Sequence, residues 1–235
     1  MSVDPVWCLF RIKPSDLLNV KKLFDLAVDE SQIVHNSQEF IQNVTRESDD
    51  FQYANKDEFN HFIPGAFVNR QQKAQAFDWD DLHNTYHLFF PQAFVEMFDR
   101  LFLGNPPVIS EPMSEAQLGF VITNRVGATE ILWGGLGWER GRRLPGYFGN
   151  MFVLPEDMTS VLANIEKIFE EVDDAEFIEG ALAIGSRGNA HEDVAKTIKS
   201  LFLSALHTVL KEGNGFLALS YPHMGSMSFP EYENA

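Results

Sequence analysis

Two local groups of residues have the types and spacing that could support chemistry. The first is His83 and His87, which stand four residues apart in the segment FDWDDLHNTYHLFF. On a helix both imidazoles would share one face, as two ligands of a metal ion do. The pair lacks the glutamate of a zinc-protease motif, and Trp79 and Tyr86 lie beside it. We therefore favour buried, hydrogen-bonded histidines and predict neither a metal nor another cofactor.

The second group is a glycine-rich stretch, residues 134–149, which carries Arg140, Arg142 and Arg143. Guanidinium groups are good ligands for anions. However, the glycine spacing is GxGxxxG, and no GK[ST] follows to reach a phosphate. We expect the glycines to form a turn where the backbone passes closely over a sheet. The arginines either bind an anion or pair with nearby acids, and we favour the pairing.

No catalytic constellation stands out from the sequence. A GxSxG nucleophile elbow is absent from the chain. Carboxylates are so numerous that the sequence selects no acid/base pair among them. Cys8 lies in the apolar run VWCLF, which is typical of a buried packing residue. We therefore predict that the protein is not an enzyme.

The formal net charge of −16 is the strongest global signal. It argues against nucleic acid as a ligand, because phosphate binding needs clustered Lys and Arg. Acids are concentrated in residues 29–81 and 156–193. Such a surface either serves solubility or forms an acidic face for a basic partner protein. The candidate partner-binding residues are Asp173, Asp174, Glu176, Glu179, Asp49, Asp50, Asp57 and Glu58.

Composition indicates a globular protein of the cytoplasm. Of the 235 residues 45% are hydrophobic, which is enough for a sizeable core. Repeats and Pro/Ser linkers are absent, so we predict a single domain over residues 1–235. The start of the sequence does not read as a signal peptide, and no apolar run has the length of a membrane helix. The single cysteine excludes an internal disulfide and fits a reducing compartment.

Elements that would position these groups follow from hydrophobic spacing and capping residues. Pro155, Glu156 and Asp157 mark the clearest helix start, followed by an apolar stripe from Met158 to Val172. The predicted strands cover residues 6–12, 147–153 and 216–221. The predicted helices cover residues 17–27, 78–90, 91–102, 114–125, 155–172, 173–184 and 189–211. This pattern predicts an α+β fold, with a small mixed sheet covered by several helices.

Four segments also occur in a characteristic order. They are FRIKPSDLLNV, FDWDDLHNTYHLFF, GYFGNMFVLPEDMTSVLANI and LFLSALHTVLKEGNGFLALSY. Their order resembles that of the YfbM-like family of small bacterial proteins, whose biochemical function is unknown. The resemblance implies an α+β fold and a bacterial cytosolic setting. Members of such families can stand beside polymorphic toxins as immunity proteins.

These observations lead to two functional hypotheses. The first is a cytoplasmic immunity protein that neutralises a cognate toxin domain by covering its basic active-site surface, with no nucleic acid or membrane involved. The alternative is an enzyme or small-ligand-binding protein that uses the Gly/Arg stretch 134–149 or the His83/His87 pair.

Overall fold

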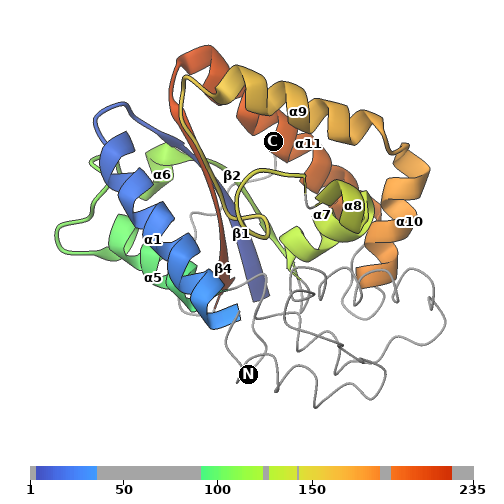
Figure 1. Cartoon of the computed structure of the whole chain (residues 1–235), viewed down its shortest axis with the longest axis horizontal. Coiled ribbons are helices and arrows are strands. Elements are labelled where there is room, and N and C mark those ends of the chain that lie inside the picture. Colours follow the sequence, from blue (N-terminus) through green and yellow to red (C-terminus); the bar gives the residue numbers. More distant parts are fainter. Residues whose placement is uncertain (1–3, 36–90, 124–126, 142, 186–191, 224–235) are drawn as a thin grey trace.

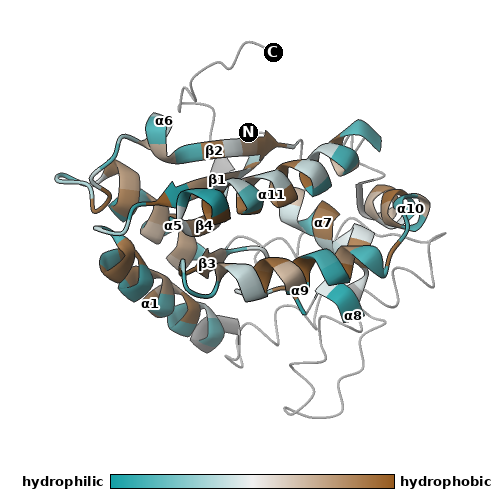
Figure 2. Ribbon diagram, turned by 90° about the horizontal axis from the view of Figure 1, so that it is seen from above, coloured by the Kyte–Doolittle hydropathy of each residue, from teal (hydrophilic) through white to brown (hydrophobic). Residues whose placement is uncertain are grey.

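A sheet of four strands lies at the centre of the computed structural model, which describes residues 4–35, 91–123, 127–141, 143–185 and 192–223 (Figure 1). The strands lie side by side in the order β2-β1-β4-β3. Their bounds are Asp4–Ile12 for β1, Gln117–Ile122 for β2, Met151–Val153 for β3 and Gly215–His223 for β4. Helices cover both faces, so the described part has three layers (Figure 2).

The predicted α+β class is confirmed, but the sheet is not mixed. All three described strand pairings are antiparallel. The central pairing joins the two ends of the chain, from Asp4 opposite His223 to Ile12 opposite Gly215. Strand composition shows that a segment is extended, but not which way it runs, so the relative direction of these distant strands was not readable.

Side chains along the central strands alternate between two hydrophobic cores, because successive residues of a strand point to opposite faces. Trp7 and Leu9 of β1 belong to one core, and Cys8 and Phe10 belong to the other. We call them the α11-side core and the α1-side core. Both central strands are therefore buried on both faces, as the apolar run at residues 216–221 predicted.

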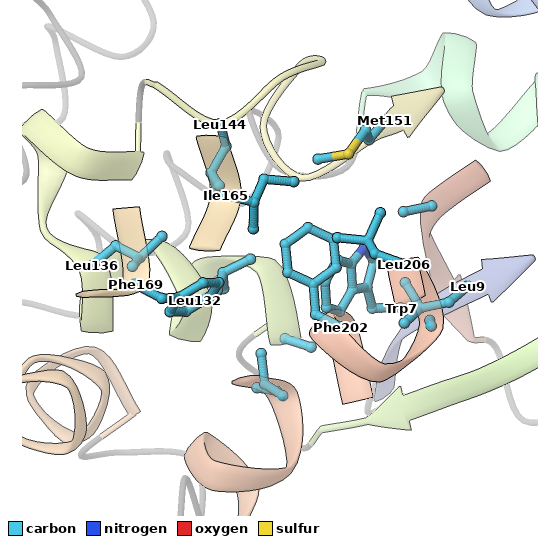
Figure 3. Close-up of a cluster of buried hydrophobic side chains, with 14 of the residues drawn as sticks. Trp7, Leu9, Leu132, Leu136, Leu144, Met151, Ile165, Phe169, Phe202 and Leu206 are labelled. Atoms are coloured by element: carbon cyan, nitrogen blue, oxygen red, sulfur yellow. The ribbon is translucent and has the colours of Figure 1, made fainter. Parts of the chain in front are cut away.

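The α11-side core lies under five helices. They are α7 (Ala128–Leu136), α8 (Trp138–Gly141), α9 (Met158–Glu170), α10 (Asp174–Gly185) and α11 (Glu192–Glu212). Phe202 packs on Trp7 with ring centroids 5.2 Å apart, and Ile165 and Phe169 approach from α9 (Figure 3). The predicted apolar stripe of α9 is confirmed, although the helix begins three residues after Pro155.

The α1-side core is rich in aromatic rings. It is covered by α1 (Leu17–His35), α5 (Gln92–Phe98), the π-helix η2 (Asp99–Leu103) and α6 (Met113–Ala116). Phe10 lies 4.4 Å from Phe102, and Phe98 lies 4.4 Å from Tyr221, measured between ring centroids. The prediction that Pro91 starts a new helix is confirmed, because α5 begins at the next residue.

The helix predicted over residues 114–125 is wrong. Of residues 114–123, which the structure describes, only 114–116 at the end of α6 are helical, and β2 follows at once. Phe120, Val121 and Ile122 are good strand formers, and their backbone extends the sheet beside β1. Backbone pairing with β1, which is distant in the sequence, makes this segment a strand. The predicted helix over residues 78–90 and the first three residues of the predicted helix 189–211 lie outside the described residues.

The predicted glycine turn after Trp133 is instead the last part of helix α7. A Cβ atom on Gly135 would lie 2.5 Å from the Phe177 ring, and one on Gly180 would lie 2.4 Å from the Gly134 carbonyl oxygen. Both distances are too short for a real contact. The glycines therefore let α7 and α10 approach closely, which offsets their low helix propensity.

The strand predicted over residues 147–153 is shortened by a tight turn. Gly146, Phe148 and Gly149 have φ angles of 91°, 49° and 86°, which are incompatible with a strand. The turn is fixed from the core side: Trp7 Nε1 donates to the Gly149 carbonyl at 3.0 Å. The side-chain oxygen of Asn150 accepts from a backbone N–H of β4 at 2.9 Å. Only Met151–Val153 continues as β3.

Candidate functional site

The four acids predicted near residue 175 lie where α9 meets α10, on the outer side of the α11-side helices (Figure 1). Together with two neighbouring carboxylates they form a surface that we call the acidic corner. All of its members are exposed to solvent. They are Glu170, Glu171, Asp173, Asp174, Glu176 and Glu179.

Other predicted site residues lie outside the described part of the chain. They are Asp49, Asp50, Asp57 and Glu58 of the second acidic cluster, the His83/His87 pair, and Arg142. The hypotheses that involve them stay predictions. Among the described residues, no group of three or more His, Cys, Asp or Glu side chains has an arrangement that would hold a metal ion.

Local folding explains why the acidic corner faces outward. Val172 and Phe177, on either side of it, are buried at 3% and 1% exposure and anchor the connection in the core. Asp173 caps α10, because its carboxylate accepts a hydrogen bond from the Glu176 backbone N–H at 2.8 Å. With the apolar residues turned inward, the remaining positions of this corner point to solvent.

Asp174 is held by a lysine from α11. Lys199 Nζ lies 2.7 Å from the carboxylate of Asp174. The same ammonium group lies 5.5 Å from the ring centre of Phe169 and 5.7 Å from that of Phe177, within the range of cation–π attraction. The hydrogen bond from Lys199 lowers the pKa of Asp174. Asp174 therefore stabilises the packing of α10 on α11.

Two arginines of the Gly/Arg stretch pair with acids of the corner. Arg140 donates to the Leu136 carbonyl at 3.1 Å and to Glu176 at 2.7 Å. Arg143 binds Glu171 through two hydrogen bonds, of 2.5 and 2.8 Å. The hydrogen bond from Arg143 is the main reason that the pKa of Glu171 is lowered. For these two arginines, the structure shows the pairing that we favoured from the sequence.

The acidic corner keeps an excess of negative charge after these pairings. Within the described part of the chain, its six carboxylates meet three cations, Arg140, Arg143 and Lys199, so three carboxylates have no described ion pair. Among the described residues, no cation lies within ion-pair distance of Glu170 or Glu179. The paired members join the corner to neighbouring segments of the chain, and the others add negative charge to the exposed surface.

A second polar cluster lies at the end of β1 and was not predicted from the sequence. The side chain of Glu111 is only 4% exposed and lies between Arg11, at 3.2 Å, and Lys13, at 3.1 Å. Arg11 also lies 3.7 Å from Glu212 at the end of α11. The alternation of Arg11 and Lys13 was visible, but Glu111 lies in an irregular segment that gave no pattern. These ion pairs join the loop before α6 to strand β1 of the sheet.

Within the described ranges, none of the helices is both long and apolar enough to cross a membrane. Comparisons of the chain with protein-family models, with curated proteins and with solved structures gave no match. The likeness to the YfbM-like family therefore stays an expectation from the sequence.

Proposed function

We propose that this chain is a cytoplasmic immunity-type binding protein, which neutralises a cognate toxin domain by covering a basic surface with its acidic corner. The observation that carries the proposal is the exposed excess of carboxylates where α9 meets α10, only three of which have an ion-pair partner among the described residues. The toxin as partner rests on the family resemblance, and the cytoplasmic location rests on the cysteine content.

Charge complementarity is the physical basis of this proposal. A surface that binds nucleic acid or another polyanion must be basic, so an acidic protein can occupy it. Opposite charges also speed the encounter of two proteins, which favours capture of a toxin soon after synthesis. A stable interface buries roughly 1,600 Å² in total. Asp49, Asp50, Asp57 and Glu58 stay in the proposal as a second part of the interface.

The ion pairs in the structure decide which acidic residues should be substituted to test partner binding. Reversing Asp174 or Glu176 would also leave Lys199 or Arg140 without its partner, so a loss of binding could reflect a disturbed fold. Glu170 and Glu179 are exposed, so the double variant E170K/E179K reverses their charge without breaking any described ion pair. A control for a single charge reversal at a distant site is E115K on α6, which is far from α10 in both views (Figures 1 and 2).

The partner to test is the product of the neighbouring gene, co-expressed with this chain. We expect it to co-purify at equal stoichiometry, and we expect E170K/E179K to slow association by roughly tenfold at low salt. The salt dependence of the association rate should also weaken, whereas E115K should behave as the parent protein does. Unchanged kinetics in the double variant would remove the acidic corner from the interface. Absence of any co-purifying protein would count against the binding function itself.

The alternative, a small-ligand-binding protein or enzyme built on residues 134–149, would require Arg140 and Arg143 to exchange Glu176 and Glu171 for a ligand. A ligand that binds only the native state must raise its thermal stability. A rise in melting temperature with phosphate or citrate, abolished in R140Q/R143Q, would favour this alternative. A metal-dependent rise abolished in H83A/H87A would favour the histidine pair.

A further inference from the structure

The turn between α11 and β4 contains the one Asn-Gly dipeptide in the sequence, Asn214–Gly215. Asparagine before glycine is the pair most prone to spontaneous deamidation, because glycine has no side chain to hinder attack by its own backbone nitrogen on the asparagine carboxamide. This reaction needs a reachable carboxamide and a backbone able to bring the two atoms together.

The backbone of the turn is a Schellman motif. The Asn214 N–H donates to the Val209 carbonyl and the Gly213 N–H donates to the Leu210 carbonyl, both at 3.3 Å. Gly213 has a φ angle of 70°, the left-handed conformation that ends many helices. Helix α11 therefore stops abruptly, and Asn214 lies between the helix and the sheet without belonging to either.

The carboxamide of Asn214 is on the solvent side of this turn. Its described contact is one hydrogen bond, from Nδ2 to Glu212 at 3.1 Å, between exposed groups. Asn214 is half-buried, and no described hydrogen bond joins its side chain to a core residue. A single surface hydrogen bond stabilises only weakly, so rotation toward the Gly215 nitrogen is accessible.

The fold itself requires the glycine. A Cβ atom on Gly215 would lie 2.4 Å from Cδ2 of Leu17, at the start of α1. Gly215 also pairs with Ile12 at the last position of the β1–β4 ladder, where a strand end opens more easily than the strand interior. Packing therefore keeps a glycine after Asn214. Gly215 is itself buried, so its nitrogen becomes reachable when this end of the ladder opens.

We propose that Asn214 is a spontaneous deamidation site of the folded protein. The Gly215 backbone nitrogen gives up its proton to water or hydroxide and attacks Cγ of Asn214. A new N–Cγ bond forms, the Cγ–Nδ2 bond breaks, and the side-chain nitrogen leaves as ammonia. Water then opens the cyclic imide at either carbonyl, which yields aspartate or isoaspartate. No oxidant or reductant takes part.

The product has consequences for this end of the sheet. A carboxylate replaces a hydrogen-bond donor beside Glu212, so attraction becomes repulsion near an acid that also neighbours Arg11. Isoaspartate additionally inserts one methylene group into the backbone just before β4, the strand that pairs with both β1 and β3. We expect the converted protein to be more acidic and to unfold at a lower temperature.

The test is prolonged incubation of the full native chain at mildly alkaline pH and physiological temperature, followed by peptide mass mapping. The peptide with Asn214 should gain one mass unit several-fold faster than the peptides with Asn19 and Asn164. These two exposed residues are internal controls, because each precedes a β-branched residue. N214Q should abolish the new acidic form, and N214D should reproduce its lowered melting temperature.

Two results would overturn the proposal. One is an intact Asn214 in folded protein at times when Asn19 or Asn164 has already converted. The other is conversion of Asn214 in urea-unfolded chain without conversion in the folded chain, which would show that the turn protects the dipeptide. Both readouts are independent of the proposed binding function.

Discussion

Glu111 shows how a single buried carboxylate can join separate parts of a fold. It lies against two cations of β1, although it belongs to the loop before α6. Its low exposure distinguishes it from the surface acids, because the strength of an ion pair depends on how far water is excluded from it.

Substitution of Glu111 should therefore lower the free energy of unfolding. E111Q keeps the shape but removes the charge between Arg11 and Lys13, and we expect a loss of about 1–3 kcal/mol of unfolding free energy. The matched control is E212Q, because Glu212 faces the same Arg11 from a position that is 35% exposed. It should cost less than about 1 kcal/mol. Urea denaturation of the three proteins measures both values, and equal losses would contradict the assigned role of burial.

Glu171 and Asp174 make stability depend on pH in a defined direction. Arg143 lowers the pKa of Glu171, and Lys199 lowers that of Asp174, so both acids bind protons less readily in the folded than in the unfolded state. The unfolded chain then takes up more protons on acidification. The stability that these pairs contribute is present at neutral pH and is lost as the pH falls through the lowered pKa values.

We expect removal of the two cations to flatten this dependence. R143Q/K199Q should lose less stability than the parent between neutral and acidic pH, measured as urea midpoints along a pH series. R100Q/K22Q, which removes the same number of charges from exposed positions on the α1 side, should keep the steepness of the parent. Parallel curves for all three proteins would show that these pairs do not contribute to acid sensitivity.

At the scale of elements, the close crossing of α7 and α10 depends on glycines inside helices. Alanine is normally the better helix former by about 1 kcal/mol, so replacing a helical glycine usually stabilises. Here the opposite should hold, because an added methyl group meets Phe177 at Gly135 and a backbone carbonyl at Gly180. The two sites differ in whether the neighbour can move.

That difference gives a prediction with an internal control. G135A and G180A should each destabilise the protein by about 1–3 kcal/mol through overpacking. F177L should restore part of the stability of G135A, because a smaller side chain makes room for the methyl group. It should not restore G180A, whose neighbour is the Gly134 carbonyl. Chemical denaturation of the single and double variants measures this coupling, and equal rescue of both would contradict the proposed contacts.

At the scale of the molecule, one sheet serves both cores, so neither core has strands of its own (Figure 2). Adjacent residues of β1 are buried in different cores. Trp7 lies in the α11-side core, and Cys8 lies in the α1-side core. Burial raises the pKa of the Cys8 thiol, which suppresses its reactivity in the folded state.

Unfolding should therefore be a single cooperative event. F98L weakens the α1-side core and F202L weakens the α11-side core, each by about 1–2 kcal/mol. Either substitution should shift the urea midpoint of Cys8 labelling and that of far-UV circular dichroism by the same amount. Separation of the two midpoints would show that the cores unfold independently, and would also contradict the predicted single domain.

Local patterns in the sequence determined much of the framework. Apolar spacing predicted the buried stripes of α9 and α11, and the apolar runs at the two ends of the chain predicted β1 and β4. The predicted end of the last helix at residue 211 is one residue short of the observed end at Glu212, where Gly213 follows in the left-handed conformation that stops a helix. Each of these features depends on residues within a few positions of one another.

The tertiary structure alone decided which charges of the candidate site are compensated. Asp174 meets Lys199 from 25 residues away, and Glu176 meets Arg140 from 36 residues away. It also decided that residues 117–122 form a strand, through pairing with β1, and that the glycines after Trp133 serve a helix crossing. The physical reason is common to these cases. Ion pairs, strand pairing and close helix contacts join residues distant in sequence, and local composition carries no information about which distant residue will be the neighbour.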